Sequence, residues 1–130
     1  MKALLDTQLL LWAAEKPERL SKAALEIITS DASELSYSLA SLWEVAIKSS
    51  LRRPDFEAHP AVLRQGFLQS GYRELTIRAE HTVALMSLPS IHKDPFDRML
   101  VAQAAVERLT LVTADATLSR YADHAPIRLV

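Results

Sequence analysis

Three aspartates of this 130-residue chain stand where an apolar run ends or where a helix begins. Asp6 follows the apolar run 3–5, and Asp115 comes shortly after the run 110–113. Asp97 falls in the first turn of a predicted helix. In an open α/β sheet, ligands collect at the carboxyl ends of the strands. Acids from these distant segments can therefore converge at one edge of a sheet and hold a cation.

A fourth acid, Glu44, lies inside an apolar helical stretch, between Trp43 and Val45. An uncompensated carboxylate in such surroundings costs free energy. Clustered carboxylates also repel one another, so a cluster persists where a cation neutralises it. Hard oxygen ligands without cysteine or paired histidines suit magnesium or manganese better than zinc. The acids together predict a site for Mg²⁺ (or Mn²⁺).

Each acid also has a structural explanation that its local sequence leaves open. Asp6 could complement the start of a helix, and Asp115 could form a turn. Asp97 lies three residues after Asp94, where an acid can complete a capping-box-like arrangement. Glu44 could be a solvated helix residue. The four acids come from four distant segments, and this favours the metal site over four separate structural roles.

Composition restricts the class of protein. A chain with 49% hydrophobic and 24% charged residues is typical of a globular protein, and its length is that of a single domain over 1–130. The lack of cysteine excludes disulfides, thiol nucleophiles and cysteine-based zinc sites. No apolar run approaches the roughly 18 residues of a membrane span, and Asp6 interrupts the apolar start. We therefore expect a cytoplasmic protein without membrane contact.

Short apolar runs alternate with helical patterns, which predicts an α/β fold with a parallel sheet. Only two glycines occur, whereas an all-β fold normally needs turn glycines at short intervals. The expected strands cover 3–5, 35–38, 75–77, 110–113 and 127–130. The expected helices begin at the caps Thr7, Ser21 and Ser38 or Ser41, cover 61–70 and 79–88, and run from the cap Asp94 to 109. Gly71 is expected to end the helix over 61–70, and 55–60 to form a polar loop.

Four segments that span most of the chain match one family in order and spacing. They are LLDTQLLLW at 4–12, SLASLWEVAIK at 38–48, LPSIHKDPFDRMLVAQA at 88–104 and LVTADATLSRY at 111–121. HKDPFDRMLVAQA is the most specific of these matches. On these segments the chain resembles PIN-domain proteins, specifically the VapC-like toxin ribonucleases of VapBC-type toxin–antitoxin pairs.

The resemblance implies a PIN-like three-layer α/β/α sandwich with a central, mostly parallel sheet, and metal-dependent cleavage of RNA phosphodiester bonds. It places the family's acidic quartet, which holds the metal and carries catalysis, on Asp6, Glu44, Asp97 and Asp115. Thr113 falls on the Ser/Thr position that supports this site by hydrogen bonding. Asp94 belongs to the same motif, where we assign it first to helix capping, with a direct or water-mediated metal role as the alternative.

One or two magnesium ions can stabilise the charge that develops during phosphodiester hydrolysis. We expect Asp6 and Asp97 to be the primary metal ligands. Glu44 and Asp115 would hold a second ion or orient a coordinated water. A metal lowers the pKa of its bound water, which removes the need for a histidine base. We therefore interpret His92, the histidine nearest to the predicted site in sequence, as a loop or partner contact.

An RNA substrate also needs cationic contacts. The candidates are Lys48, Arg52, Arg53, Lys93 and Arg98. Arg98 directly follows Asp97, although it could instead pair with Asp94. Trp12 and Trp43 could stack on bases, but their apolar helical surroundings favour packing.

The resemblance further implies a cognate VapB-like antitoxin, an RNA substrate such as tRNA or rRNA, and a homodimer. The apolar first helix, LLLWAA, could leave an exposed groove for an antitoxin segment. The net charge of −1 gives no general attraction to nucleic acid, but four of the acids are predicted to bind cations. A phosphoacceptor receiver domain needs a lysine on a late strand, near its phosphoacceptor. This alternative is disfavoured because the last lysine, Lys93, precedes the strand 110–113. A non-catalytic PIN-like module that binds RNA or protein stays open as the alternative.

Overall fold

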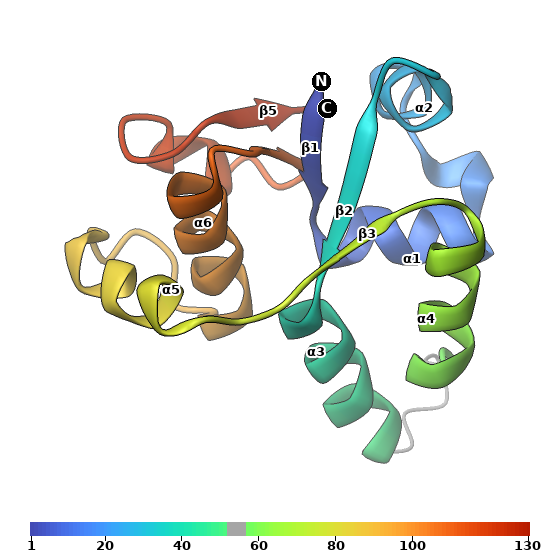
Figure 1. Cartoon of the computed structure of the whole chain (residues 1–130), viewed down its shortest axis with the longest axis horizontal. Helices are drawn as coiled ribbons and strands as arrows, with labels where there is room; N and C mark the ends of the chain where they lie inside the picture. Colours follow the sequence, from blue (N-terminus) through green and yellow to red (C-terminus); the bar gives the residue numbers. More distant parts are fainter. Residues whose placement is uncertain (52–56) are drawn as a thin grey trace.

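The computed structural model describes residues 1–51 and 57–130. A five-stranded sheet forms its centre, with the strand order β3-β2-β1-β4-β5 and parallel pairing throughout (Figure 1). The strands are β1 (Lys2–Leu5), β2 (Glu34–Ser38), β3 (Arg73–Leu75), β4 (Thr110–Thr113) and β5 (Ile127–Leu129). The helices are α1 (Thr7–Glu15), α2 (Lys22–Thr29), α3 (Leu39–Ser50), α4 (Pro60–Gln69), α5 (Ala79–Ala84) and α6 (Pro95–Glu107). Three 3₁₀ turns complete the description: η1 (Pro17–Arg19), η2 (Leu85–Ser87) and η3 (Leu118–Tyr121).

Helices cover both faces of the sheet, so the molecule has three layers. Helices α1, α2 and α4 lie on one side, and α6 lies on the other with α5 packed against it (Figure 1). Two apolar clusters fill the two interfaces, and β1 contributes Leu5 to one and Leu4 to the other. Successive strand residues point to opposite faces, which explains why this strand is apolar without interruption. The three-layer α/β/α sandwich with a parallel sheet, expected from the resemblance, is confirmed.

The residue that caps the N-terminus of α1 differs from the prediction. Asp6, rather than Thr7, caps α1, because its Oδ1 accepts a hydrogen bond from the Leu9 N–H at 2.9 Å. Thr7 is already the first helical residue, and its hydroxyl donates to Ser41 Oγ at 2.8 Å. Ser38 caps α3, so Ser41 is free to make this contact between α1 and α3.

Other element boundaries differ by a few residues. The strand predicted at 75–77 begins earlier, at Arg73, and ends at Leu75. The helix predicted over 79–88 is divided into α5 and η2. Gly71 follows α4 with a φ of 84°, a left-handed conformation that favours glycine, as predicted. Of the predicted loop 55–60, residues 55 and 56 lie outside the described residues, and Pro60 begins α4. None of the helices in the described ranges is both long and apolar enough to span a membrane.

Candidate metal centre

Two neighbouring strands bring Asp6 and Thr113 together. Strands β1 and β4 pair with Leu5 opposite Val112, and the Asp6 N–H extends this ladder to the Val112 carbonyl at 3.1 Å. The Thr113 hydroxyl donates to Asp6 Oδ2 at 2.5 Å and accepts from the Asp115 N–H at 3.0 Å. Thr113 therefore fixes the orientation of one acid and the backbone of another, in the supporting position that the resemblance implied.

Asp6 is only 4% exposed. Burial raises its pKa, and the negative charge of Asp115 acts in the same direction. Hydrogen bonds from Thr113 and from the Leu9 N–H lower the pKa, but they do not offset the burial. A nearby cation would stabilise the ionised form of this carboxyl group.

Helix α3 brings Glu44 to the same site as Asp6. This helix follows β2, the strand that pairs with β1 on the side away from β4. The helix starts directly after β2, and Glu44 in its second turn is 7% exposed. One turn later, Lys48 Nζ donates to Glu44 Oε2 at 2.8 Å. Among the described residues, Glu44 Oε1 is a buried side-chain oxygen without a hydrogen-bond partner. Buried polar atoms normally have partners, and a bound cation would satisfy this oxygen.

Asp97 enters the site from the first turn of α6. Asp94 caps this helix, as predicted, because its Oδ1 accepts from the N–H groups of Phe96 at 2.8 Å and Asp97 at 3.2 Å. The N–H of Asp94 donates to Nδ1 of His92 at 3.2 Å. Asp97 therefore does not complete a capping box, and its side chain lines the cleft instead.

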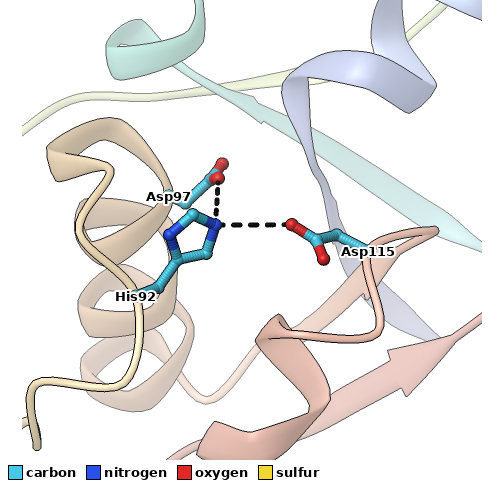
Figure 2. Close-up of side chains that lie close together, drawn as sticks. All are labelled: His92, Asp97 and Asp115. Atoms are coloured by element: carbon cyan, nitrogen blue, oxygen red, sulfur yellow. Dashed lines mark ion pairs between the residues drawn. The ribbon is translucent and has the colours of Figure 1, made fainter.

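His92 lies between Asp97 and Asp115 (Figure 2). Its Nε2 is 3.2 Å from Asp97 Oδ2 and 3.4 Å from Asp115 Oδ2. The three atoms lie within 4.8 Å of one another, close enough to share one ion. The sequence placed His92 near the site but assigned it no contact there. The one local signal was its position two residues before the cap of α6.

The pKa of Asp97 is raised to about 7. Burial is the largest cause, and the negative charges of Asp94, Glu44 and Asp6 add to it. His92 acts in the opposite direction but does not cancel these effects. Burial and the neighbouring carboxylates therefore outweigh the effect of His92 on the pKa of Asp97.

The four predicted acids line one cleft of about 440 Å³. Its lining consists of Asp6, Thr7, Gln8, Leu11, Trp12, Glu44, Lys48, Asp94, Asp97, Ala114 and Asp115. The structure thus brings together the whole predicted quartet, with Asp94 and Lys48 beside it and Thr113 bonded to Asp6. A set of carboxylate oxygens with one unpartnered buried member fits a hard divalent cation.

Arg98 does not line this cleft. Its guanidinium group donates to the Pro89 carbonyl at 2.8 Å and to the Tyr121 hydroxyl at 3.1 Å. These bonds hold the segment before α6 against η3, and no ion pair joins Arg98 to Asp94 among the described residues. Arg98 therefore has a structural role, and its predicted RNA contact stays a prediction.

The other predicted cationic contacts fall in three places. Lys48 lines the cleft, whereas Lys93 is exposed and lies outside its lining. Arg52 and Arg53 lie outside the described residues. Lys48 is therefore the one of these candidates that lines the acidic cleft among the described residues.

The two tryptophans differ in their surroundings. Trp12 packs against an apolar cluster while one part of it lines the cleft, so its predicted packing is confirmed. Trp43 is 59% exposed and makes an edge-on contact with Phe96 at 5.1 Å between ring centroids. The prediction that Trp43 is mainly a packing residue is therefore wrong, because more than half of its surface is exposed.

A second groove, of about 500 Å³, lies between α1 and α4. Its apolar lining includes Ala13, Ala14, Val62, Leu63 and Phe67. Val62 is 67% exposed, so this lining is open to a partner. The groove agrees with the expectation of an exposed apolar surface beside the first helix.

The parallel sheet, its helical layers and the acidic cleft at its carboxyl edge define an α/β class of protein with a cluster of carboxylates. The chain belongs to the PIN domain family, whose model matches residues 3–124. Among curated proteins, none matches this sequence significantly.

Several solved structures share the fold at low sequence identity. VapBC2 from Rickettsia felis, bound to a DNA fragment from its promoter, has a TM-score of 0.75 and 17% identity, with coverage of 100% of this chain and 99% of that chain. DNA-bound VapBC from Salmonella typhimurium has a TM-score of 0.67 and 16% identity, with coverage of 98% and 97%. FitAcB from Neisseria gonorrhoeae has a TM-score of 0.64 and 17% identity, with coverage of 97% and 96%. At these identities the likeness establishes the fold.

Proposed function

We propose that this protein is a metal-dependent endoribonuclease, the toxin of a VapBC-type toxin–antitoxin pair, which inhibits translation by cutting tRNA or rRNA. The observation that carries the proposal is the convergence of Asp6, Glu44, Asp97 and Asp115 in one cleft. Membership of the PIN family and the motif resemblance support the assignment to RNA cleavage. The proposed substrates require a cytoplasmic location.

A bound Mg²⁺ or Mn²⁺ would neutralise charge on the phosphate and lower the pKa of a water molecule. We assign Asp6 and Asp97 as its primary ligands, with Glu44 and Asp115 holding a second ion or orienting water. Thr113 keeps Asp6 Oδ2 in place through its short hydrogen bond, so the carboxylate does not have to reorganise. In the hydrolysis, water adds to phosphorus, the P–O bond to the leaving oxygen breaks, and that oxygen takes up a proton.

Lys48 is the proposed phosphate contact. Its side chain is 38% exposed and lines the cleft beside Glu44, so the ammonium group faces both the acid and the solvent. An ammonium group binds phosphate as a compact point charge. The same group offsets part of the negative charge that the quartet presents to RNA.

The test is cleavage of a panel of tRNA and rRNA fragments by the purified protein, free of antitoxin. We expect cutting with Mg²⁺ or Mn²⁺, none with EDTA, and none for Asp6→Asn or Asp97→Asn. Asp123→Asn is the matched control, because Asp123 is exposed and lies outside the cleft. Cutting that survives both EDTA and the substitutions would refute the proposal. RNA binding without any cutting would favour the non-catalytic module.

We also propose a VapB-like antitoxin as the partner. Two of the solved structures named above are VapBC structures by their descriptions, and the groove between α1 and α4 offers an apolar surface for an extended or helical segment. An upstream overlapping gene for a small protein with a DNA-binding start would supply the candidate. Co-purification with that protein, and its loss in Val62→Asp, tests the assignment. The homodimer stays a prediction, which analytical ultracentrifugation can check.

A further inference from the structure

We propose that His92 competes with the divalent cation for the carboxylates of Asp97 and Asp115, and thereby sets the cation affinity of the cleft. The inference rests on the proposed metal-dependent function. It assigns to His92 neither the role of a base nor that of a metal ligand. It begins from the position of the imidazole between two acids of the quartet (Figure 2).

The hydrogen bonds of the imidazole decide which nitrogen carries the proton. The Asp94 N–H donates to His92 Nδ1 at 3.2 Å, so Nδ1 acts as an acceptor. A neutral imidazole that accepts at Nδ1 has its hydrogen on Nε2. The Nε2–H group therefore lies beside both acids, with Nε2 3.2 Å from Asp97 Oδ2 and 3.4 Å from Asp115 Oδ2. A metal-binding histidine normally has the reverse arrangement, in which the second ring nitrogen donates an N–H to a fixed acceptor.

The imidazole N–H and a cation would need the same oxygens. Mg²⁺ binds carboxylate oxygens at about 2.0–2.1 Å, and His92 Nε2 already lies within 3.4 Å of one oxygen of each acid. The positive end of the N–H dipole would repel a cation placed between these oxygens. The ring would therefore have to turn away before one ion could bind both Asp97 and Asp115.

The surroundings of His92 allow this movement. Its side chain is 22% exposed, so one side of the ring is open. The backbone is held independently, because the His92 N–H donates to the Tyr121 hydroxyl at 2.9 Å. Substitution of the ring should therefore leave the loop anchored and the fold intact.

The test is a titration with Mn²⁺ in which electron paramagnetic resonance measures the free ion. We expect His92→Ala to bind Mn²⁺ about tenfold more tightly than the wild type, as the loss of one competing polar contact with the two carboxylates would give. His124→Ala, at an exposed histidine outside the cleft, should bind like the wild type. Weaker binding by His92→Ala would identify His92 as a ligand and overturn the proposal, and unchanged binding would overturn it as well.

Two further measurements do not depend on the alanine variant. His92→Gln retains an N–H donor and should bind Mn²⁺ with an affinity between those of the wild type and His92→Ala. Electron spin-echo modulation of the wild type with Mn²⁺ should lack the coupling of a coordinated imidazole nitrogen, and its presence would refute the competitor role. If the wild type binds no Mn²⁺, the proposed function fails too. If it binds Mn²⁺ and the His92 variants do not differ from it, only the inference about His92 fails.

Discussion

Two histidines of this molecule lie against carboxylates but in opposite electrostatic surroundings. His81 accepts a backbone N–H at Nδ1 and places Nε2 2.9 Å from Glu107 Oε1, as His92 does toward Asp97 at 3.2 Å. Glu107 also receives a hydrogen bond from Arg78, and the bonds from His81 and Arg78 hold its pKa below the usual value. The pKa of Asp97 is instead raised to about 7.

The difference lies in the ratio of donors to carboxylates. At the contact between α5 and α6, two donors serve one carboxylate, so the charge is satisfied and the contact stabilises the fold. At the cleft, one imidazole faces two carboxylates while further acids raise the pKa of one of them. A histidine–carboxylate contact therefore does not by itself mark a functional site, whereas unneutralised carboxylates around it do.

The largest expected effect is on RNA cleavage. Asp6→Asn should lower the initial rate at least about 100-fold, because a neutral amide cannot replace a buried anionic ligand. Glu107→Gln is the matched change at the contact between α5 and α6, and it should leave the cleavage rate of the folded protein unaltered. The measurement is the initial rate on a fluorescent RNA with Mg²⁺. Equal losses in both variants would remove the functional distinction between the two regions.

The next effect is on stability at the contact between α5 and α6. His81 is fully buried, and His81→Ala should lower the free energy of unfolding by about 2–3 kcal/mol because it removes packing and hydrogen bonds together. Urea unfolding should give this loss with and without added Mn²⁺. His124→Ala, which is exposed, should change stability by less than about 0.5 kcal/mol. A loss that Mn²⁺ reverses would mean that His81 belongs to the cation site.

The carboxylates of Asp97 and Glu107 should contribute to the pH dependence of the unfolding free energy with opposite signs. Folded Asp97 binds its proton more tightly than in the unfolded chain, so its contribution falls as the pH rises from about 4 to about 7. Without added cation at pH 8, the free energy of unfolding of Asp97→Asn should therefore exceed that of the wild type by about 1–2 kcal/mol, after a discount for solvent screening. The variant should accordingly unfold at a higher urea concentration.

Glu107 should behave in the reverse manner. Its folded pKa is lowered, so its contribution is present above the pKa of the unfolded chain and disappears as the pH falls through the folded value. Glu107→Gln should accordingly destabilise the protein at neutral pH and have little effect in strong acid. Parallel urea titrations of Asp97→Asn and Glu107→Gln, at neutral to mildly alkaline pH and in acid, check both predictions. A destabilised Asp97→Asn at pH 8 would instead favour a capping role for Asp97.

The smallest effect concerns Lys48. In an Asp6→Asn background, which leaves the RNA uncut, Lys48→Met should weaken RNA binding about fivefold and reduce the slope of log affinity against log salt by about one. Fluorescence anisotropy at several salt concentrations gives both values. Lys22→Met, on the exposed side of α2, is the control and should change neither value. An unaltered slope for Lys48→Met would show that the ammonium group serves Glu44 alone.

The sequence predicted the parts of this molecule that depend on local patterns. Short apolar runs gave the strands, and the Asp94–Pro95 pair gave the start of α6. Asp6 and Asp115 were expected at one edge because they follow parallel strands. Glu44 and Asp97 lie in predicted helices, and the motif resemblance assigned them to the same site.

Contacts between distant segments could not be predicted in this way. The position of His92 depends on the Tyr121 hydroxyl, which lies 29 residues further along the chain. Arg98 follows Asp97 in sequence, but successive helical residues point about 100° apart, so the two side chains face different surroundings. Adjacency in the chain was therefore a poor guide to adjacency in the site.

The most direct test of the account is the effect of Mn²⁺ on the unfolding free energy of the wild type, Asp6→Asn and Glu107→Gln at neutral pH. Mn²⁺ at a hundred times its dissociation constant should stabilise the wild type by about 2.7 kcal/mol. Glu107→Gln should gain the same increment from its lower starting value, and Asp6→Asn should gain little or none. A wild type that Mn²⁺ does not stabilise, or an equal gain in Asp6→Asn, would contradict the claim that these carboxylates form a cation site.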